Sequence, residues 1–93
     1  MQIKMVNVMI RTHLSDGEVS DHPIKVMFVP PTAESEADEY VRRQALVSKE
    51  VKDAVKHALT DPNVIVAKGD AVLYYPQHSV LRVEAVFVSI DSH

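Results

Sequence analysis

The sequence predicts an α+β fold of order β-β-α-β-β, in which one long helix packs on one face of an antiparallel sheet of four to five strands. Three observations predict it. Residues 3–14 and 80–90 alternate with the two-residue period of strands, and residues 40–59 carry a stripe with helical period. Prolines separate these segments. A chain of 93 residues fits one domain spanning residues 1–93.

The first two strands are expected to form a hairpin. Residues 3–14 alternate apolar and polar positions, and residues 24–29 do the same after the Asp16-Gly17 turn signal. Gly17 suits such a turn because glycine accepts positive φ. Pro30 and Pro31 end the second strand, since neither can donate a ladder hydrogen bond.

The helix is expected to begin after Thr32 or Ser35, either of which can serve as its N-cap, and to run to about Leu59. Acidic residues crowd its first turns and basic residues its later turns, which complements the helix dipole. Its apolar stripe should face the sheet. The stripe consists of Tyr40, Val41, Val47, Val51, Ala54, Val55, Ala58 and Leu59.

The remaining strands complete the predicted sheet. Residues 64–67 and 71–75 flank a turn at Gly69, and residues 80–90 form the clearest strand of the chain. A single helix covers only one face of a sheet. The covered face is expected to contain Val6, Val8, Ile10, Leu81, Val83, Ala85 and Phe87.

The opposite face of the sheet is also predicted to be partly apolar. Monomers rarely expose contiguous apolar patches above a few hundred Å², so this face is expected to be a contact surface, most simply between two copies in a homodimer. A foreign partner could use it instead, or the sheet could curl enough to bury both sides. The expected contact residues are Met5, Met9, Met27, Val86, Val88 and Ile90.

A second surface of interest lies on the polar side of the helix. Leu46 falls outside the apolar stripe, between Arg43 and Glu50. It is either an ordinary exposed leucine or an anchor for a partner, with the two charged residues as a polar rim. We expect this side to face solvent, because burying its charges costs more than burying one leucine gains.

Composition and charge exclude several classes of function. The chain has no cysteine, which excludes disulfides, thiolate metal sites and cysteine nucleophiles, and fits a cytoplasmic location. Ten Lys and Arg against 13 Asp and Glu give a net charge of −3, which argues against nucleic-acid binding. No segment has the ~20 apolar residues of a membrane span, and no cofactor or metal is expected.

Two clusters offer weak alternatives for catalysis. His13, Asp16 and His22 surround the first turn and could converge on a divalent metal, but they lack a fixed ligand motif. Tyr75 and His78 flank Pro76 and could do acid–base work. Polar turn residues and a strand end explain both clusters more simply.

These observations favour a small, non-catalytic cytoplasmic protein that acts through protein–protein binding and self-associates through the exposed face of its sheet. The length and the β-β-α-β-β pattern are also similar to those of small phage and mobile-element proteins, so an inhibitor of a host protein complex is an alternative. A small metal- or ligand-dependent enzyme built on His13, Asp16 and His22 is the second alternative.

Overall fold

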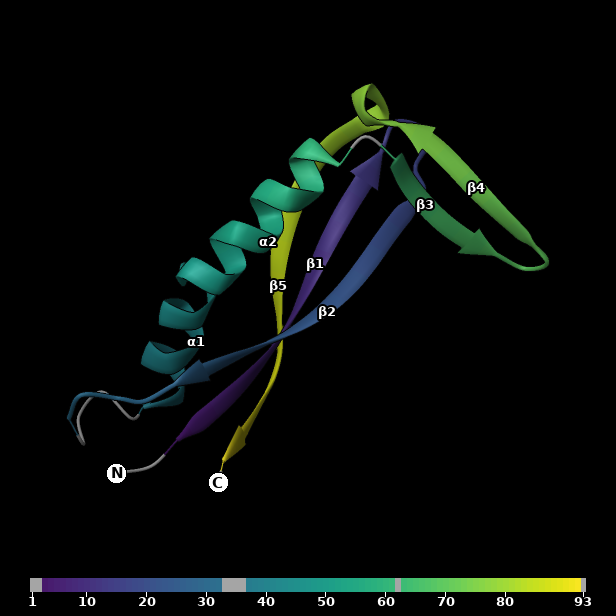
Figure 1. The fold of residues 1–93 in the computed structure, drawn as a ribbon. Coiled ribbons are helices and arrows are strands. Elements are labelled where there is room, and N and C mark those ends of the chain that lie inside the picture. Colours follow the sequence, from purple (N-terminus) through teal and green to yellow (C-terminus); the bar gives the residue numbers. More distant parts are fainter. Residues whose placement is uncertain (1–2, 33–36, 62, 93) are drawn as a thin grey trace.

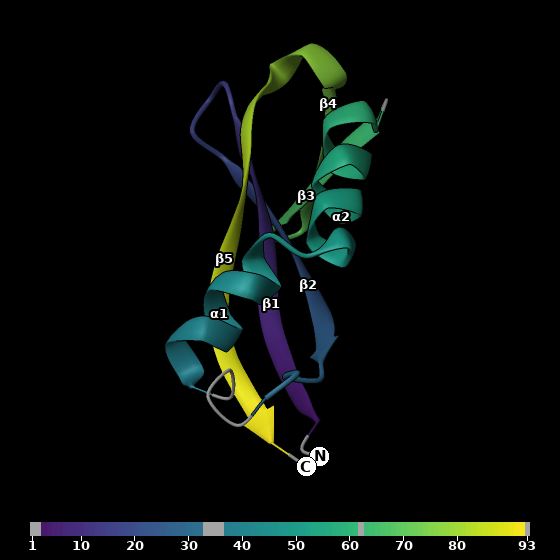
Figure 2. The same ribbon diagram turned by 90° about the vertical axis from the view of Figure 1, so that its left-hand side faces the viewer.

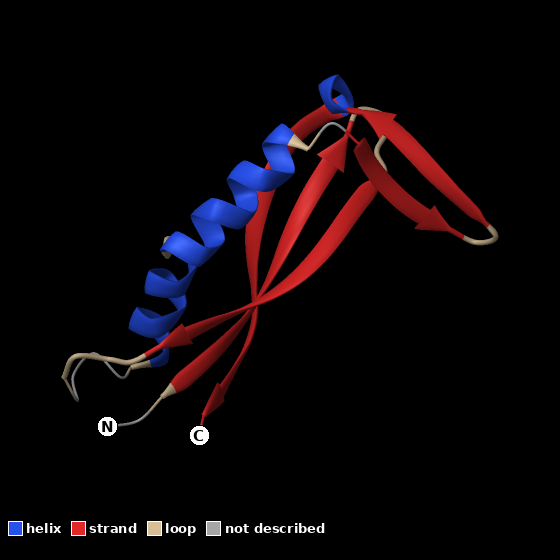
Figure 3. Ribbon diagram, viewed as in Figure 1, coloured by secondary structure: helices blue, strands red, loops and turns tan. Residues whose placement is uncertain are grey.

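The computed structural model describes residues 3–32, 37–61 and 63–92 (Figures 1 and 3). It is an α+β structure with one long bent helix layer and two antiparallel sheets. The elements follow in the order β1 (Lys4–Leu14), β2 (Val19–Phe28), α1 (Asp38–Leu46), α2 (Lys49–Thr60), β3 (Asn63–Lys68), β4 (Ala71–Pro76), the 3-10 turn η2 (Gln77–Ser79) and β5 (Val80–Ser92). The predicted N-cap Ser35 lies outside the described residues.

The main sheet has three strands in the order β2-β1-β5. The predicted hairpin of β1 and β2 is confirmed, with Gly17 in its turn at φ 90°. β2 begins at Val19, earlier than predicted, because Asp16 tightens the turn by accepting a hydrogen bond from the backbone N–H of Glu18 at 3.0 Å. β1 pairs with a neighbour on each side and is the central strand.

The prediction of a single sheet of four to five strands is wrong, because β3 and β4 form a separate two-stranded sheet. One face of this hairpin packs on Leu14 at the end of β1. Two side-chain contacts fix it to the β1–β2 turn: Tyr75 donates to Asp16 at 2.6 Å, and Lys68 pairs with Glu18. The hairpin is therefore anchored at one end of the main sheet (Figure 1).

The helices cover one face of the main sheet, and α1 crosses in front of β5 and β1 (Figure 2). Alternate residues of β1 are buried beneath them, as predicted. Most of the predicted covered face packs in this core, namely Val6, Val8, Ile10, Val83, Ala85 and Phe87. Leu81 is the exception, being 69% exposed, because the pairing of β5 with β1 skips a residue between Arg82 and Val80.

The predicted continuous helix is interrupted between Leu46 and Lys49. Ser48 leaves helical geometry and caps α2 by accepting a hydrogen bond from the N–H of Val51 at 3.4 Å. This interruption changes which side chains face the sheet. Leu46 packs against the core, whereas Val47 is 56% exposed, so the predicted orientation of these two residues is wrong. Arg43 and Glu50 are exposed as expected.

The molecule is elongated, with extents of 46 × 25 × 16 Å and a radius of gyration of 15.4 Å. A compact chain of this length has a radius of gyration of about 12 Å. The β3–β4 hairpin accounts for part of the difference, since it projects from the end of the sheet on the β2 side, away from the helices (Figure 1). None of the helices in the described ranges is long and apolar enough to cross a lipid bilayer.

Candidate interaction surfaces

The face of the main sheet opposite the helices carries rows of paired polar side chains. Arg11 on β1 donates to both carboxylate oxygens of Asp21 on β2, at 2.8 and 3.2 Å. His13 lies 2.6 Å from Glu84 on β5, between the imidazole Nε2 and a carboxylate oxygen. Asn7 donates to the Ser89 hydroxyl at 2.8 Å and to Asp91 at 3.0 Å. Cross-strand pairs of this kind stabilise the sheet itself.

The pKa values of these groups follow from the same contacts. The hydrogen bond from Arg11 lowers the pKa of Asp21, and the bond to Asp21 raises the pKa of Arg11. The hydrogen bond with His13 lowers the pKa of Glu84. All three shifts favour the charged forms, so the middle of this face is polar.

Four of the six predicted contact residues share this face as two cross-strand pairs. Met5 lies opposite Met27, and Met9 lies opposite Val86. The polar side chain of Asn7 lies between the two pairs on β1, so the apolar surface of this face is discontinuous.

The other two predicted contact residues lie elsewhere, because β5 contains a β-bulge beside Asn7 and Val8 of β1. Val88 occupies the bulge and is 54% exposed. Beyond it the alternation is reversed, so Ile90 turns to the helix side and packs against the core. The prediction that Ile90 belongs to the exposed face is therefore wrong.

A more continuous apolar surface lies on the other side of β5, along the flank of α2. It is a groove of about 410 Å³. Val47 and Leu59 are 56% and 43% exposed there, although both were assigned to the sheet-facing stripe. The apolar lining consists of Leu46, Val47, Val51, Val55, Leu59 and Ala85.

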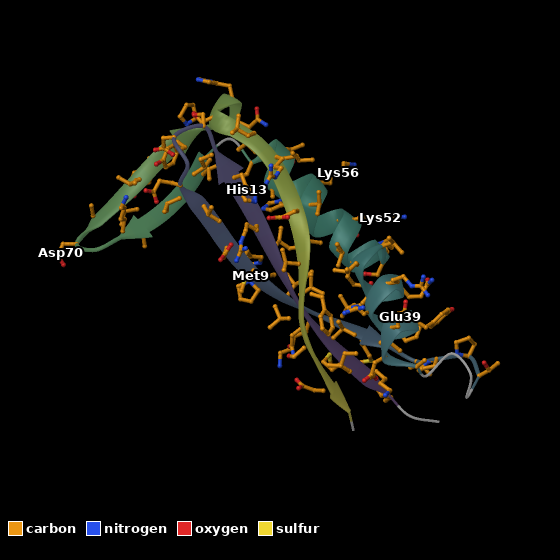
Figure 4. All side chains as sticks on the ribbon, turned by 180° about the vertical axis from the view of Figure 1, so that it is seen from behind. Met9, His13, Glu39, Lys52, Lys56 and Asp70 are labelled. Atoms are coloured by element: carbon orange, nitrogen blue, oxygen red, sulfur yellow. The ribbon has the colours of Figure 1, made fainter. Side chains whose placement is uncertain are left out.

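Lysines border this groove on its solvent side. Lys52 and Lys56 belong to its lining, and both are exposed. In Figure 4 they lie along the helix layer, on the opposite side of β5 from Met9 and His13. Long lysine side chains can cover apolar surface with their methylene groups while the ammonium group stays in water. The groove is therefore apolar at its base and basic at its rim.

The backbone edge of β5 runs beside the groove. β5 pairs with β1 on one side, and in the described part of the chain no strand pairs with its other side. Between its two irregularities, Arg82–Phe87 pair regularly with β1 and include no proline. Such an edge presents N–H and C=O groups that a further strand can bind.

The sequence cluster of His13, Asp16 and His22 does not come together. His13 pairs across the sheet with Glu84, Asp16 contacts Tyr75, and His22 lies on the helix side of β2. The hydrogen bond to Asp16 raises the pKa of Tyr75 to about 12, and the same bond lowers the pKa of Asp16. Within residues 3–32, 37–61 and 63–92, no three metal-binding side chains gather.

His22 instead lines a cleft of about 310 Å³ between β2, α2 and β3. His57 and Asp61 from the end of α2 line it too, together with the buried Thr12. Tyr75 and His78, the other sequence pair, do not line it, and Tyr75 is engaged by Asp16.

Sequence reasoning missed the groove because it assumed one unbroken helix. A continuous helix places Val47 on the same side as Val51, towards the sheet. The signal that could have found the break is Ser48, because serine favours caps over helix interiors. A cap at Ser48 begins a new helix, so residues before and after it need not share one stripe.

Comparison with protein-family models, with curated proteins and with solved structures finds no match for this chain. Its function is therefore inferred from the surfaces described above.

Proposed function

We propose that this protein is non-catalytic and acts by binding protein along the edge of β5 and the adjoining groove. The observation that carries the proposal is the juxtaposition of a regular, unpaired strand edge with an apolar groove of about 410 Å³. Strand addition at such an edge provides backbone hydrogen bonds, and the groove beside it accepts apolar side chains.

This surface fits the expected protein-binding function better than the exposed sheet face does. Binding on the sheet face would desolvate the paired charges of Arg11, Asp21 and Glu84. Removing paired charges from water often costs more than it gains. The groove requires no such step, because its base is apolar and the lysine ammonium groups of Lys52 and Lys56 can remain at its rim.

Site-specific photo-crosslinking tests the proposal. A photoreactive phenylalanine analogue replaces Leu59 in the groove or, as a control, Tyr74 on the outer face of the β3–β4 hairpin, which is 72% exposed. After irradiation of cells that express each variant, we expect a covalent protein adduct from position 59 and little from position 74. The adduct can contain a second copy of the chain or a foreign protein, and its mass distinguishes the two.

Equal labelling at both positions, or an adduct from position 74 alone, would contradict the proposal. An adduct between position 59 and a foreign protein would favour the alternative of an inhibitor that binds a host complex.

A further inference from the structure

The charges beside the β5 edge are not balanced by the chain itself. The charged residues of the groove lining are both lysines, Lys52 and Lys56, and both are exposed. Within residues 3–32, 37–61 and 63–92, neither forms an ion pair with an acidic side chain. Lys49, by contrast, is held by Asp53 on the same helix, at 3.3 Å between the ammonium nitrogen and a carboxylate oxygen. The two lysines of the groove rim are therefore available to an acidic partner.

The order of charges around α2 keeps acidic groups away from this rim. At about 100° per residue, Glu50 lies about 160° around the helix axis from Lys52. It shares the flank of His57, which lines the cleft beside β2. Asp53 lies between the two flanks and is engaged by Lys49. The side of α2 that faces the β5 edge is therefore basic, although the whole chain has a net charge of −3.

β5 itself adds a third cation on the opposite face of the sheet. Arg82 is exposed and lies opposite His13, at the start of the regular stretch Arg82–Phe87. The acidic residue of that stretch is Glu84, and its carboxylate is engaged by His13 at 2.6 Å. A strand added to β5 therefore meets lysines on its helix-facing side and an arginine on its other side.

Acidic residues of the chain lie towards the other end of the edge. Asp38 and Glu39, at the start of α1, line a hollow with Phe87 and Ile90, and Asp38 pairs with Lys4 at 3.6 Å. Figure 4 shows Glu39 near one end of the helix layer, with Lys52 and Lys56 farther along it. The edge thus has a basic half beside α2 and an acidic end beside α1.

We infer that the partner at the β5 surface is an extended acidic segment of another protein, which adds to β5 as a strand and places apolar side chains in the groove. The inference rests on the proposed function, since it names the chemistry of the partner that binds the same surface. The acidic residues of the segment lie beside α2, where they face Lys52, Lys56 and Arg82. Complementary charges steer such a segment to the edge and fix its position along the strand.

The spacing of the lysines fits a strand. Lys52 and Lys56 are four residues apart on α2, which is a rise of about 6 Å. Residues on one face of a strand are two positions apart, about 6.8 Å along the chain. Two acidic residues at alternate positions of the added strand therefore match the two lysines. The residue between them points to the opposite face, on the side of Arg82. A short acidic run next to apolar residues satisfies all three cations.

Selection from random peptides tests this chemistry with a defined probe. A display library of random twelve-residue peptides is selected on the immobilised wild type and, in parallel, on Lys52→Glu and Lys56→Glu. Peptides bound by the wild type should be several-fold enriched in Asp and Glu next to apolar residues, and each variant should reduce that enrichment. The control is Lys25→Glu, at an exposed lysine on β2, which changes the net charge equally and should retain the acidic preference.

One selected acidic peptide then allows affinities to be compared. At low ionic strength, Lys52→Glu and Lys56→Glu should each raise its dissociation constant about fivefold or more, because each replaces an attraction by a repulsion. Lys25→Glu should change the constant less than about twofold. The photoreactive analogue at position 59 should label this peptide, and the analogue at position 74 should not.

Wild-type selections without acidic enrichment, or an acidic preference that survives both lysine reversals, would overturn the inference. A wild type that sediments at twice 10.4 kDa at micromolar concentration and binds no acidic peptide would identify a second copy as the occupant, and would overturn it too. The proposed function is tested separately, because an adduct from position 59 in cells supports protein binding whatever charge the partner carries.

Discussion

The main sheet has two edges, and they are built differently. β2 contains Pro23, which cannot donate to a further strand, and charged residues on either side of it, Asp21 and Lys25. Its first residues are also close to the β3–β4 hairpin, where the Ser20 hydroxyl donates to the backbone carbonyl of Ile65 at 3.3 Å. β5 has a regular stretch from Arg82 to Phe87 with no proline and an apolar groove beside it.

This difference indicates which edge is adapted for pairing. Proline, charge and a covering segment are the usual means by which proteins prevent unwanted strand addition. β2 has all three. On β5, the side chain of Glu84 is held by His13 on the sheet face, and the bulges lie at the ends of the regular stretch. The contrast supports the assignment of β5, rather than β2, as the binding edge.

The largest expected effect concerns the hairpin that shields the start of β2. Leu14 is 1% exposed and forms the core beneath this hairpin with Val64 and Val66. Leu14→Ala should cost about 2–5 kcal/mol of unfolding free energy, because it leaves a cavity there. Urea denaturation measures this cost. A loss below about 1 kcal/mol would show that the hairpin is not packed on the sheet in this way.

The second prediction removes the protection of β2 directly. Pro23→Val supplies an N–H group and a β-branched side chain, so the β2 edges should begin to pair. The molecules should then associate through β2, which light scattering detects as the concentration rises. Pro76→Val, at the end of β4, is the control and should scatter no more than the wild type. Unchanged scattering by Pro23→Val would show that proline does not protect this edge.

The third prediction concerns the pH range over which the hairpin stays attached. The pKa of Tyr75 is raised from its ordinary value of 10 to about 12. A raised pKa in the folded state means that the Tyr75–Asp16 bond stabilises fully below about pH 10, and that its contribution is lost as the pH rises towards 12. Asp16→Asn should lower the pKa of Tyr75 back towards 10, which an ultraviolet absorbance titration of the tyrosines measures. Tyr75→Phe should abolish that titration step, and an unchanged profile in Asp16→Asn would contradict the assignment.

The smallest expected effect distinguishes the sheet face from the β5 surface. Met27 is 61% exposed on β2, and Met27→Glu should change neither the unfolding free energy by more than about 0.5 kcal/mol nor the yield of the photo-crosslinked adduct from position 59. Val47→Glu, at a residue with similar exposure in the groove, should reduce the yield of that adduct strongly. If Met27→Glu abolishes the adduct and Val47→Glu does not, the sheet face is the interface.

Local patterns in the sequence were sufficient to predict most of the elements. Strict alternation predicted β1, and Asp16-Gly17 predicted its turn into β2. Strand partners could not be predicted in the same way. The β3–β4 hairpin has apolar residues on both faces, so nothing in its own pattern shows whether it joins the main sheet.

The errors in the candidate surfaces have a common physical cause, which is a change of phase within an element. The bulge at Val88 turns Ile90 towards the core, and the cap at Ser48 turns Val47 towards solvent. One extra residue in a strand reverses the face of the positions after it. The helix break changes the residues beside it, whereas Val51, Ala54 and Val55 after it still pack against the core. Neither event has a strong local signature, although a serine within a helix is a weak one.

Amide hydrogen exchange measured by NMR over a range of protein concentrations tests the central claim most directly. With the partner present at high concentration, whether it is a second copy or a foreign protein, the outward-pointing amides between Arg82 and Phe87 should be protected, and dilution below the dissociation constant should remove this protection. The outward-pointing amides of β2 between Asp21 and Val26 should exchange rapidly at every concentration. Rapid exchange of the β5 amides at all concentrations, or concentration-dependent protection of β2 instead, would contradict the assignment of β5 as the binding edge.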